Sequence, residues 1–291
     1  FNRASDSSNA GDISDSAGRL RLLRAERHQR KLRRGTHISN GFSIRLHNVQ
    51  CSDITSTVDA VLQRIQSIKD QGFPNYIGAQ RFGQDQRNVE RVQRWIASPK
   101  TRVSRQKRSL WLSVARSIIF NEVVAARVVD NSWQHLQPGE PVMLHGSRSY
   151  FCPSEDEFDS DSLRHRLKSM DVHPSAPWWG RGDPIARGRC ATFEAQIVSR
   201  LKPYSQVLER FSMDQQRRAL RTSVTSLEHS WLNDQTLKLK FNLLPGVFAT
   251  TLLRELGQCI EPERTNHGVS QEDAVSLTKQ QKQRAWLAES E

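Results

Sequence analysis

The sequence lacks the long apolar run that a membrane helix needs and the paired cysteines that a zinc site or a disulfide framework uses. No apolar stretch in its 291 residues approaches the ~20 residues that cross a bilayer. The four cysteines are far apart and form no C-x-x-C pair, which is typical of reduced thiols in a cytosolic protein. They are Cys51, Cys152, Cys190 and Cys259. We therefore expect a cytoplasmic protein without structural zinc or disulfides.

Several catalytic signatures and a start methionine are also missing. The chain has no H-E-x-x-H, no P-loop and no G-x-S-x-G motif, and its G-R-G at Gly180–Gly182 lies between Trp-Trp and Asp-Pro, which indicates a loop. The first residue is Phe1, and residues 2–18 are polar and acidic without the basic and apolar regions of a signal peptide. We expect residues 2–18 to be an exposed loop and the chain to be a piece of a longer reading frame.

What the sequence has in excess is positive charge. Lysine and arginine number 43 against 31 acidic residues, giving a net charge of +12. Apolar residues make up 36% and charged residues 25%, a balance typical of a globular protein with a sizeable core. The basic surplus favours a polyanionic partner such as nucleic acid, and the alternative is a generally basic, soluble surface.

Hydrophobic periodicity predicts an α/β chain with an interruption. Residues 42–49 and 237–243 alternate as strands do, and residues 54–71, 88–97, 108–129, 192–201 and 247–256 follow helical spacing. Less regular patterns predict a strand at 20–26, short strands in 138–151, a helix in 155–170, a loop at 172–189 and a helix at 214–220. The sheet pattern therefore stops, gives way to a mostly helical middle and resumes, as when one domain is inserted into another.

Four segments carry a resemblance to a known family. They are R-K-L-R-R-G from Arg30 followed by Asn40-Gly-Phe42, F-P-N-Y-I-G-A-Q-R-F-G over Phe73–Gly83, K-R-S-L-W-L-S-V-A-R-S from Lys107, and L-P-G-V-F-A-T-T-L-L-R-E-L ending at Leu256. Their order and spacing resemble the TruD family of tRNA pseudouridine synthases over about residues 20–256. The P-N-Y-x-G-x-Q-R-F-G stretch is the specific one, because each of the others would be weak alone.

The resemblance implies a fold and a reaction. The fold would be α/β (α+β), a pseudouridine synthase catalytic domain with a mixed, largely antiparallel sheet, interrupted by an inserted TRUD α/β domain. We expect the catalytic domain at residues 1–73 and 221–256, the insertion at 74–220 and a polar tail at 257–291. The reaction would isomerise uridine to pseudouridine in tRNA, at position 13 in bacterial members, without cofactor or metal. The base must leave the helix first, because its glycosidic bond is unreachable in a stack.

The catalytic aspartate that the resemblance implies has no match in this sequence. The family carries it in a G-x-K-D motif upstream of the R-K-L-R segment, and nothing before Arg30 matches that motif. Asp6, Asp12 and Asp15 lie in a Ser/Gly/Asn stretch without a neighbouring lysine, so we reject all three. We expect the catalytic strand to lie before Phe1 and these residues alone to be inactive. The alternative is a non-catalytic RNA-binding module on the same scaffold.

Three residues match positions of the family's base pocket. Asn40 matches an asparagine that supports the catalytic aspartate, although a turn residue beside Gly41 is the structural alternative. Phe42 matches the aromatic that stacks on the target base, and its alternation also fits a core residue. Phe248 matches a second pocket aromatic, with helix packing an equal alternative.

Basic clusters add expected RNA contacts, although for any single arginine a solvated surface is the stronger interpretation. The expected contacts are Arg27, Arg30, Lys31, Arg33, Arg34, Arg105, Lys107 and Arg108. We expect Phe73–Gly83 to serve packing, and Glu194 to lie at the surface or behind the site.

Overall fold

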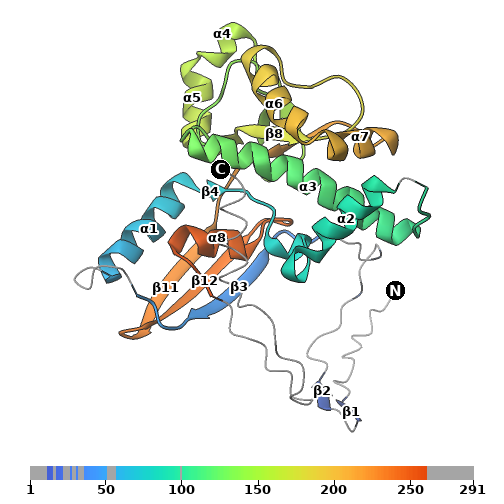
Figure 1. The fold of residues 1–291 in the computed structure, drawn as a ribbon. Coiled ribbons are helices and arrows are strands. Elements are labelled where there is room, and N and C mark those ends of the chain that lie inside the picture. The colour runs from blue at the N-terminus through green and yellow to red at the C-terminus, as the bar shows by residue number, and fades with distance from the viewer. Residues whose placement is uncertain are drawn as a thin grey trace, which may run out of the picture. The chain divides into compact units, whose positions relative to one another are not determined.

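The computed structural model describes residues 36–50, 57–98 and 100–260, together with Arg27 and Lys31 and the backbone of two short strands (Figure 1). These strands, β1 (Asp12–Asp15) and β2 (Gly18–Arg21), pair antiparallel. The expected loop over residues 2–18 is therefore wrong at Asp12–Asp15. The predicted strand at 20–26 overlaps β2 at its start, and residues 22–26 and the tail after 260 lie outside the described residues. No helix among the described residues is both long and apolar enough to cross a membrane.

A three-stranded antiparallel sheet forms the first layer, in the order β11-β12-β3. β12 (Thr236–Leu243) lies between β11 (Thr225–Asn233) and β3 (Asn40–Leu46). The strict alternation of β12 buries four side chains on one face. They are Leu237, Leu239, Phe241 and Leu243. Burial of each such side chain stabilises the fold by roughly 1.5–3 kcal/mol.

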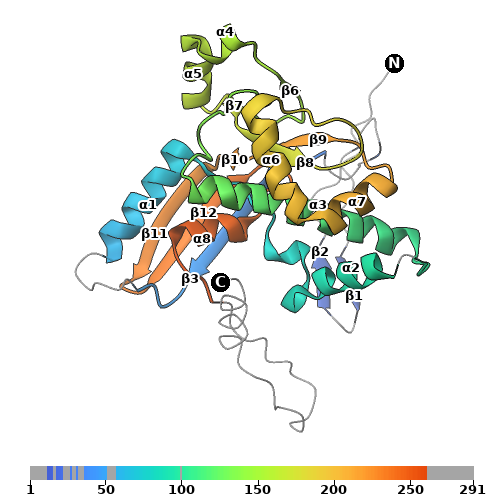
Figure 2. The ribbon, with the colours of Figure 1, turned by 45° about the horizontal axis from the view of Figure 1, so that its top comes forward.

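Two helices complete this layer's core. The apolar stripe of α1 (Thr57–Gln71) supplies Val61, Ile65 and Ile68, and α8 (Ala249–Leu256) supplies Leu252 and Leu253 to the same cluster as β12. Both helices cover the sheet in Figures 1 and 2. The core therefore joins the first third of the chain to its last fifth, with a long excursion between them.

Gly72 turns the chain into this excursion. Its φ of +72° is left-handed, and a Cβ there would lie 2.4 Å from the carbonyl oxygen of Thr222, so only glycine fits. The chain then enters β4 (Phe73–Pro74), which pairs antiparallel with β10 (Arg221–Thr222). Entry into and exit from residues 74–220 are thus hydrogen-bonded neighbours. This is the connection that an inserted domain requires, and the division at these points stays our proposal.

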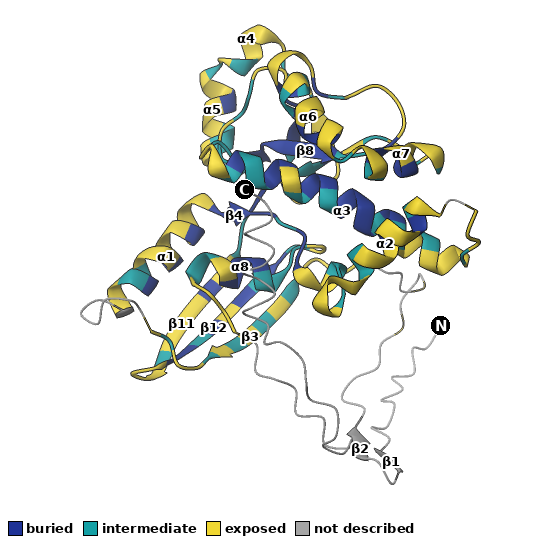
Figure 3. Cartoon of the chain, viewed as in Figure 1, coloured by how far each residue is buried: buried dark blue, intermediate teal, exposed yellow. Residues whose placement is uncertain are grey.

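The excursion is organised around α3 (Arg105–Val129), whose middle is buried on most sides (Figure 3). α2 (Arg87–Ala97), α6 (Gly188–Arg200) and α7 (Lys202–Arg210) contact it, as does β8 (Ser175–Trp178). Smaller elements are η1 (Ala79–Arg81), η2 (Gln84–Gln86), β5 (Val142–Leu144), β6 (Tyr150–Phe151), α4 (Glu155–Phe158), α5 (Asp161–Lys168), β7 (Val172–His173) and β9 (Gln216–Ala219). The structure is thus mixed α/β, and its strand ladders are antiparallel.

Two predicted elements in the excursion are wrong. Residues 214–220 contain strand β9 instead of a helix, and the expected loop at 172–189 contains β7 and β8, of which β8 pairs with β9. Strand β9 also carries a buried charge, because Arg217 makes a two-pronged ion pair with Glu194, at 2.7 and 2.9 Å. Glu194 is 4% exposed, so of the two positions expected for it the one at the surface is wrong. Tertiary pairing overrides the local helical pattern.

Candidate active site

The candidate site begins with an aromatic pair on the sheet. Phe42 of β3 lies opposite Phe241 of β12, and their rings stack with centroids 5.3 Å apart at 23°. Phe241 is 2% exposed, whereas Phe42 is only partly buried. Phe42 thus packs at the margin of the hydrophobic core and is still reached by solvent. A ring with this placement can support a second flat group by stacking.

Asn40 lies two residues before Phe42 and starts the same strand. Its backbone is opposite Leu243, the last residue of β12, so Asn40 marks the end of the sheet. Alternation along a strand directs side chains two residues apart to the same face, so Asn40 and Phe42 share one. The side chain of Asn40 is partly exposed. Its amide can accept one hydrogen bond and donate another at this edge.

Phe248 follows the same end of the sheet after a tight turn. Beyond Leu243 the chain turns through Gly246 at φ +84°, with Val247 N donating to Leu244 O at 3.1 Å. Phe248 then precedes the first turn of α8, and its carbonyl oxygen accepts from Thr251 Oγ1 at 2.6 Å. A Cβ at Gly78 would lie 2.8 Å from the ring of Phe248. The Phe73–Gly83 segment therefore forms the floor on which Phe248 rests.

That segment is held in place by two asparagines. Asn121 of α3 accepts from Ile77 N at 2.8 Å and donates to Ile77 O at 3.0 Å. Asn75 donates to Ala219 O at 2.9 Å. Tyr76 lies under the guanidinium of Arg254, 5.8 Å away, and burial raises the pKa of its hydroxyl. Because these contacts fix the backbone beneath Phe248, the segment's observed contacts are those of packing.

Arg218 is a residue that the sequence analysis missed. Its Nη2 donates to Gly246 O at 3.0 Å and to Asn75 Oδ1 at 3.1 Å, so it ties the turn before Phe248 to the segment below it. Its guanidinium lies over the rings of Phe120 and Trp178. Burial, together with the nearby charge of Arg81, lowers its pKa to about 10. The helical pattern of residues 214–220 hides this role, because it predicts no partner for the side chain.

The structure places the expected RNA-binding cations on separate elements. Arg27 and Lys31 are exposed, while Arg30, Arg33 and Arg34 lie outside the described residues. The first turn of α3 contains Arg105, Lys107 and Arg108. Arg108 lies over the ring of Phe211, 5.4 Å from its centroid. Arg105 and Lys107 remain exposed and available to an anion.

Acidic and metal-binding groups do not converge in the parts that the structure covers. Within the described ranges, no group of three or more His, Cys, Asp or Glu side chains could hold a metal ion. Asp6 lies outside these ranges, and Asp12 and Asp15 are described only as the backbone of β1. Asn40 and Phe42 share one face of β3, and Phe248 follows the turn beyond the same end of the sheet.

Comparison with known proteins decides the family. The family model described as "tRNA pseudouridine synthase D (TruD)" matches residues 7–103 and 97–256, which is most of the chain. The chain belongs to the TruD family. The sequence resemblance in the four motif segments is thereby confirmed.

Curated TruD relatives align over most of this chain. The tRNA pseudouridine synthase D of Methylococcus capsulatus is 39% identical over 237 residues, covering 81% of this chain and 65% of the relative. That of Pseudomonas entomophila is 40% identical over 247 residues, covering 85% and 68%. The chain thus spans about two thirds of the length of these relatives. Whether this chain shares their activity is the subject of a proposal below.

A solved structure confirms the fold. The crystal structure of a putative tRNA pseudouridine synthase D from Methanosarcina mazei aligns with a TM-score of 0.58 at 17% identity. The alignment covers 84% of this chain and 74% of that one. The expected α/β fold of a TruD protein, with its antiparallel sheet, is therefore correct.

Proposed function

We propose that this TruD chain takes part in the isomerisation of uridine to pseudouridine in tRNA, at position 13. The supporting observation is the partly exposed ring of Phe42, which stacks on Phe241 at the sheet end shared by Asn40 and Phe248. The names and 39–40% identity of the bacterial relatives support tRNA as the substrate. The chain's net charge of +12 fits a polyanionic partner.

Phe42 has the role of base support in this proposal. The target uridine leaves its stack and lies against the Phe42 ring, which is held flat by Phe241. Phe248, fixed by Gly78, closes the pocket from the turn before α8. Stacking a base on an aromatic ring contributes about 1–3 kcal/mol. The rigid floor lowers the ordering cost of binding, because the aromatic side chains are already in place.

Asn40 has the role of orienting a catalytic carboxylate. The aspartate would attack the ribose or the base and free the uracil for reattachment through carbon. No G-x-K-D motif occurs in the 291 residues, so we propose that polypeptide outside them supplies this carboxylate. These residues alone would then bind tRNA without converting it. A non-catalytic RNA-binding module is the second candidate, favoured by the same missing motif.

The exposed cations are proposed to contact phosphate. Arg27, Lys31, Arg105 and Lys107 are all exposed, and each can neutralise a phosphate and release counterions. Arg108 contributes less freely, because its guanidinium is engaged with Phe211. We extend the proposal to Arg30, Arg33 and Arg34 on sequence grounds alone.

The test compares two proteins on the same tRNA. One is the chain of 291 residues, and the other carries in addition, at its N-terminus, a segment with the G-x-K-D motif that the family resemblance implies. Pseudouridine at position 13 is mapped after incubation. We expect both proteins to bind and only the extended one to convert uridine. If the extended protein binds but does not convert uridine, the module interpretation gains; if neither binds, the RNA proposal fails.

Variants of the extended protein then test the pocket. Phe42→Ala removes the stacking surface, so we expect about a tenfold or greater loss of conversion, since ~1.4 kcal/mol or more of stacking free energy is removed. Phe151→Ala is the matched control, because Phe151 is also partly buried but lies on β6. Equal losses in both variants would contradict the assigned role of Phe42.

A further inference from the structure

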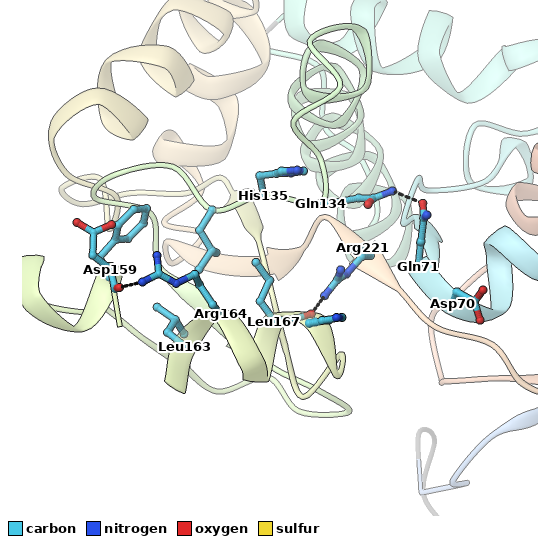
Figure 4. A pocket seen from close by; sticks show the side chains of 12 residues that line it. Asp70, Gln71, Gln134, His135, Asp159, Leu163, Arg164, Leu167 and Arg221 are labelled. Atoms are coloured by element: carbon cyan, nitrogen blue, oxygen red, sulfur yellow. Dashed lines mark hydrogen bonds between the residues drawn. The ribbon is translucent and has the colours of Figure 1, made fainter. Parts of the chain in front are cut away.

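A cavity of about 620 Å³ lies away from the residues of the candidate active site. It is an open pocket lined by the end of α1, the loop after α3, the end of α4, helix α5 and strand β10, and Figure 4 shows its lining side chains. None of Asn40, Phe42 and Phe248 lines it. The volume falls in the range typical of small-molecule sites, roughly 300–1,000 Å³.

Arg221 is the buried charge of this cavity. It is 5% exposed, its Nε donates to His173 Nδ1 at 3.3 Å, and its Nη2 donates to Leu167 O at 2.7 Å and Val172 O at 3.1 Å. These neutral acceptors explain two of its three nitrogens. These bonds use Nε and Nη2, and the residue itself lines the cavity. No carboxylate among these acceptors compensates the charge, and burial lowers its pKa to about 10.

Two further cations and an apolar wall accompany Arg221. Lys168 is exposed at the end of α5 and lines the cavity beside Leu167. Arg164, one turn earlier, also lines the cavity but forms an ion pair with Asp161 at 3.3 Å. The wall is formed by Leu136, Phe158, Leu163 and Leu167. A ligand that uses both features carries an anionic head and a flat apolar body.

Hydrogen-bond acceptors also line the cavity, and Figure 4 shows Asp70 and Gln71 beside Arg221, and Asp159 at the opposite end. Gln134 Nε2 donates to Gln71 Oε1 at 3.1 Å, and the carboxylate of Asp70 lines the cavity next to them. Asp159 lines the cavity as well, and its carbonyl oxygen accepts from Arg164. Amide and carboxylate groups at this position suit the amino edge of a base. The cations Arg221 and Lys168 are the lining groups that can hold an anionic head.

We propose that this cavity binds a purine nucleotide, with its phosphate on Arg221 and Lys168 and its base against the leucine and Phe158 wall. The nucleotide is either a free monophosphate or an unstacked purine of an RNA chain. Both sources present the same phosphate and the same base. The site does not depend on the proposed isomerisation, because it uses none of that pocket's residues.

Calorimetric titration of the full chain with AMP, adenosine and inorganic phosphate tests the proposal. AMP should bind at least about tenfold more tightly than either part alone, because head and body contacts add and each tenfold needs only ~1.4 kcal/mol. Lys168→Gln removes a charge without breaking a hydrogen bond among the described residues. It should weaken AMP about tenfold, because one charge-assisted bond of roughly 1.5 kcal/mol is removed. Lys202→Gln, at an exposed lysine of α7, is the matched control and should leave AMP binding unchanged.

Competition with tRNA separates the two sources. If tRNA displaces AMP, and Lys168→Gln also weakens tRNA, the nucleotide belongs to RNA; if AMP and tRNA bind independently, it is a free monophosphate. AMP that binds no better than phosphate would overturn the site. Equal behaviour of Lys168→Gln and Lys202→Gln would also overturn it. Arg221→Lys is a further variant, which removes the planar guanidinium fork. If it does not fold, the comparison of Lys168→Gln with Lys202→Gln decides alone.

Discussion

At the scale of single residues, His173 makes the stability of the fold depend on pH. Its Nδ1 accepts from Arg221 Nε, and its Nε2 lies 2.8 Å from His145 Nδ1. Because Arg221 occupies Nδ1 as a donor, the ring proton belongs on Nε2 and is donated to His145. Burial lowers the pKa of His173 most, and the charges of Arg221 and His145 lower it further, to about 3. The negative charge of Asp171 acts in the opposite direction. The folded protein therefore keeps this ring neutral.

Acid should destabilise the protein through His173. Below its ordinary pKa near 6.5 the unfolded chain takes up a proton that the folded chain refuses, so stability falls as the pH drops from about 6.5 toward 3. Between about pH 7 and pH 5 the loss is about 2 kcal/mol. Denaturant unfolding at both pH values measures it. His173→Gln should flatten this dependence, whereas an unchanged slope would show that other groups carry it.

Glu194 and Arg217 form a buried ion pair that contributes to stability. Both are almost fully buried, and Arg217 also bonds Ser175 through Nε at 3.0 Å. Glu194→Gln would leave a buried guanidinium without its counter-charge, a change that costs about 3–5 kcal/mol. Denaturant unfolding checks it. The exposed pair Arg164 and Asp161 is the comparison, and Asp161→Asn should cost less than about 1 kcal/mol. Equal losses would contradict the buried-pair account.

At the scale of elements, sequence predicts best where one local signal acts alone. The strict alternation of β12 and the stripe of α1 predict their elements correctly because each element buries one face against a single core. The pattern of β9 predicts a helix instead, because its ladder partner β8 lies about forty residues earlier in the chain and pairing of this kind has no local signature. For the same reason the sequence does not reveal the contacts of Arg218 with Gly246 and Asn75.

The candidate site, too, can be predicted from the sequence only in part. Asn40 and Phe42 follow from motif and alternation, and their common face is a property of any strand. The stacking of Phe42 on Phe241 depends on the register between β3 and β12, which the sequence does not state. The support of Phe248 by Gly78 joins segments 170 residues apart and emerges only from the fold. Residue types are thus foreseeable, and their mutual support is not.

Gly78 offers the element-scale prediction. Gly78→Ala would place a Cβ within 2.8–2.9 Å of three side-chain atoms of Phe248, and overpacking of this kind costs about 1–3 kcal/mol. We expect lower stability and a displaced Phe248, measured by denaturant unfolding and by conversion in the extended protein. Gly257→Ala is the control, because a Cβ there meets nothing within 4 Å. Equal behaviour of the two variants would contradict the floor assigned to Gly78.

For the whole molecule, the surplus of positive charge predicts salt-sensitive RNA binding. Neutralising Arg30, Lys31, Arg33 and Arg34 should weaken tRNA binding and flatten its dependence on salt, by about 0.7–0.9 in logarithmic slope for each phosphate that the variant no longer neutralises. Four exposed cations elsewhere, Arg148, Arg189, Arg200 and Lys202, make the control with the same change in net charge. An equal slope in both variants would show that net charge, and no particular cluster, attracts the RNA.

The most direct test of the central claim is a photo-crosslink. A tRNA carrying 4-thiouridine at position 13 is bound to the chain, irradiated and digested, and the modified peptide is identified by mass spectrometry. If the target base contacts Phe42 and Phe248, crosslinks are expected at one of these two residues. They should be abolished in Phe42→Ala and kept in Phe151→Ala. Crosslinks confined to the helices of residues 74–220, with Phe42 and Phe248 unmodified, would contradict the account.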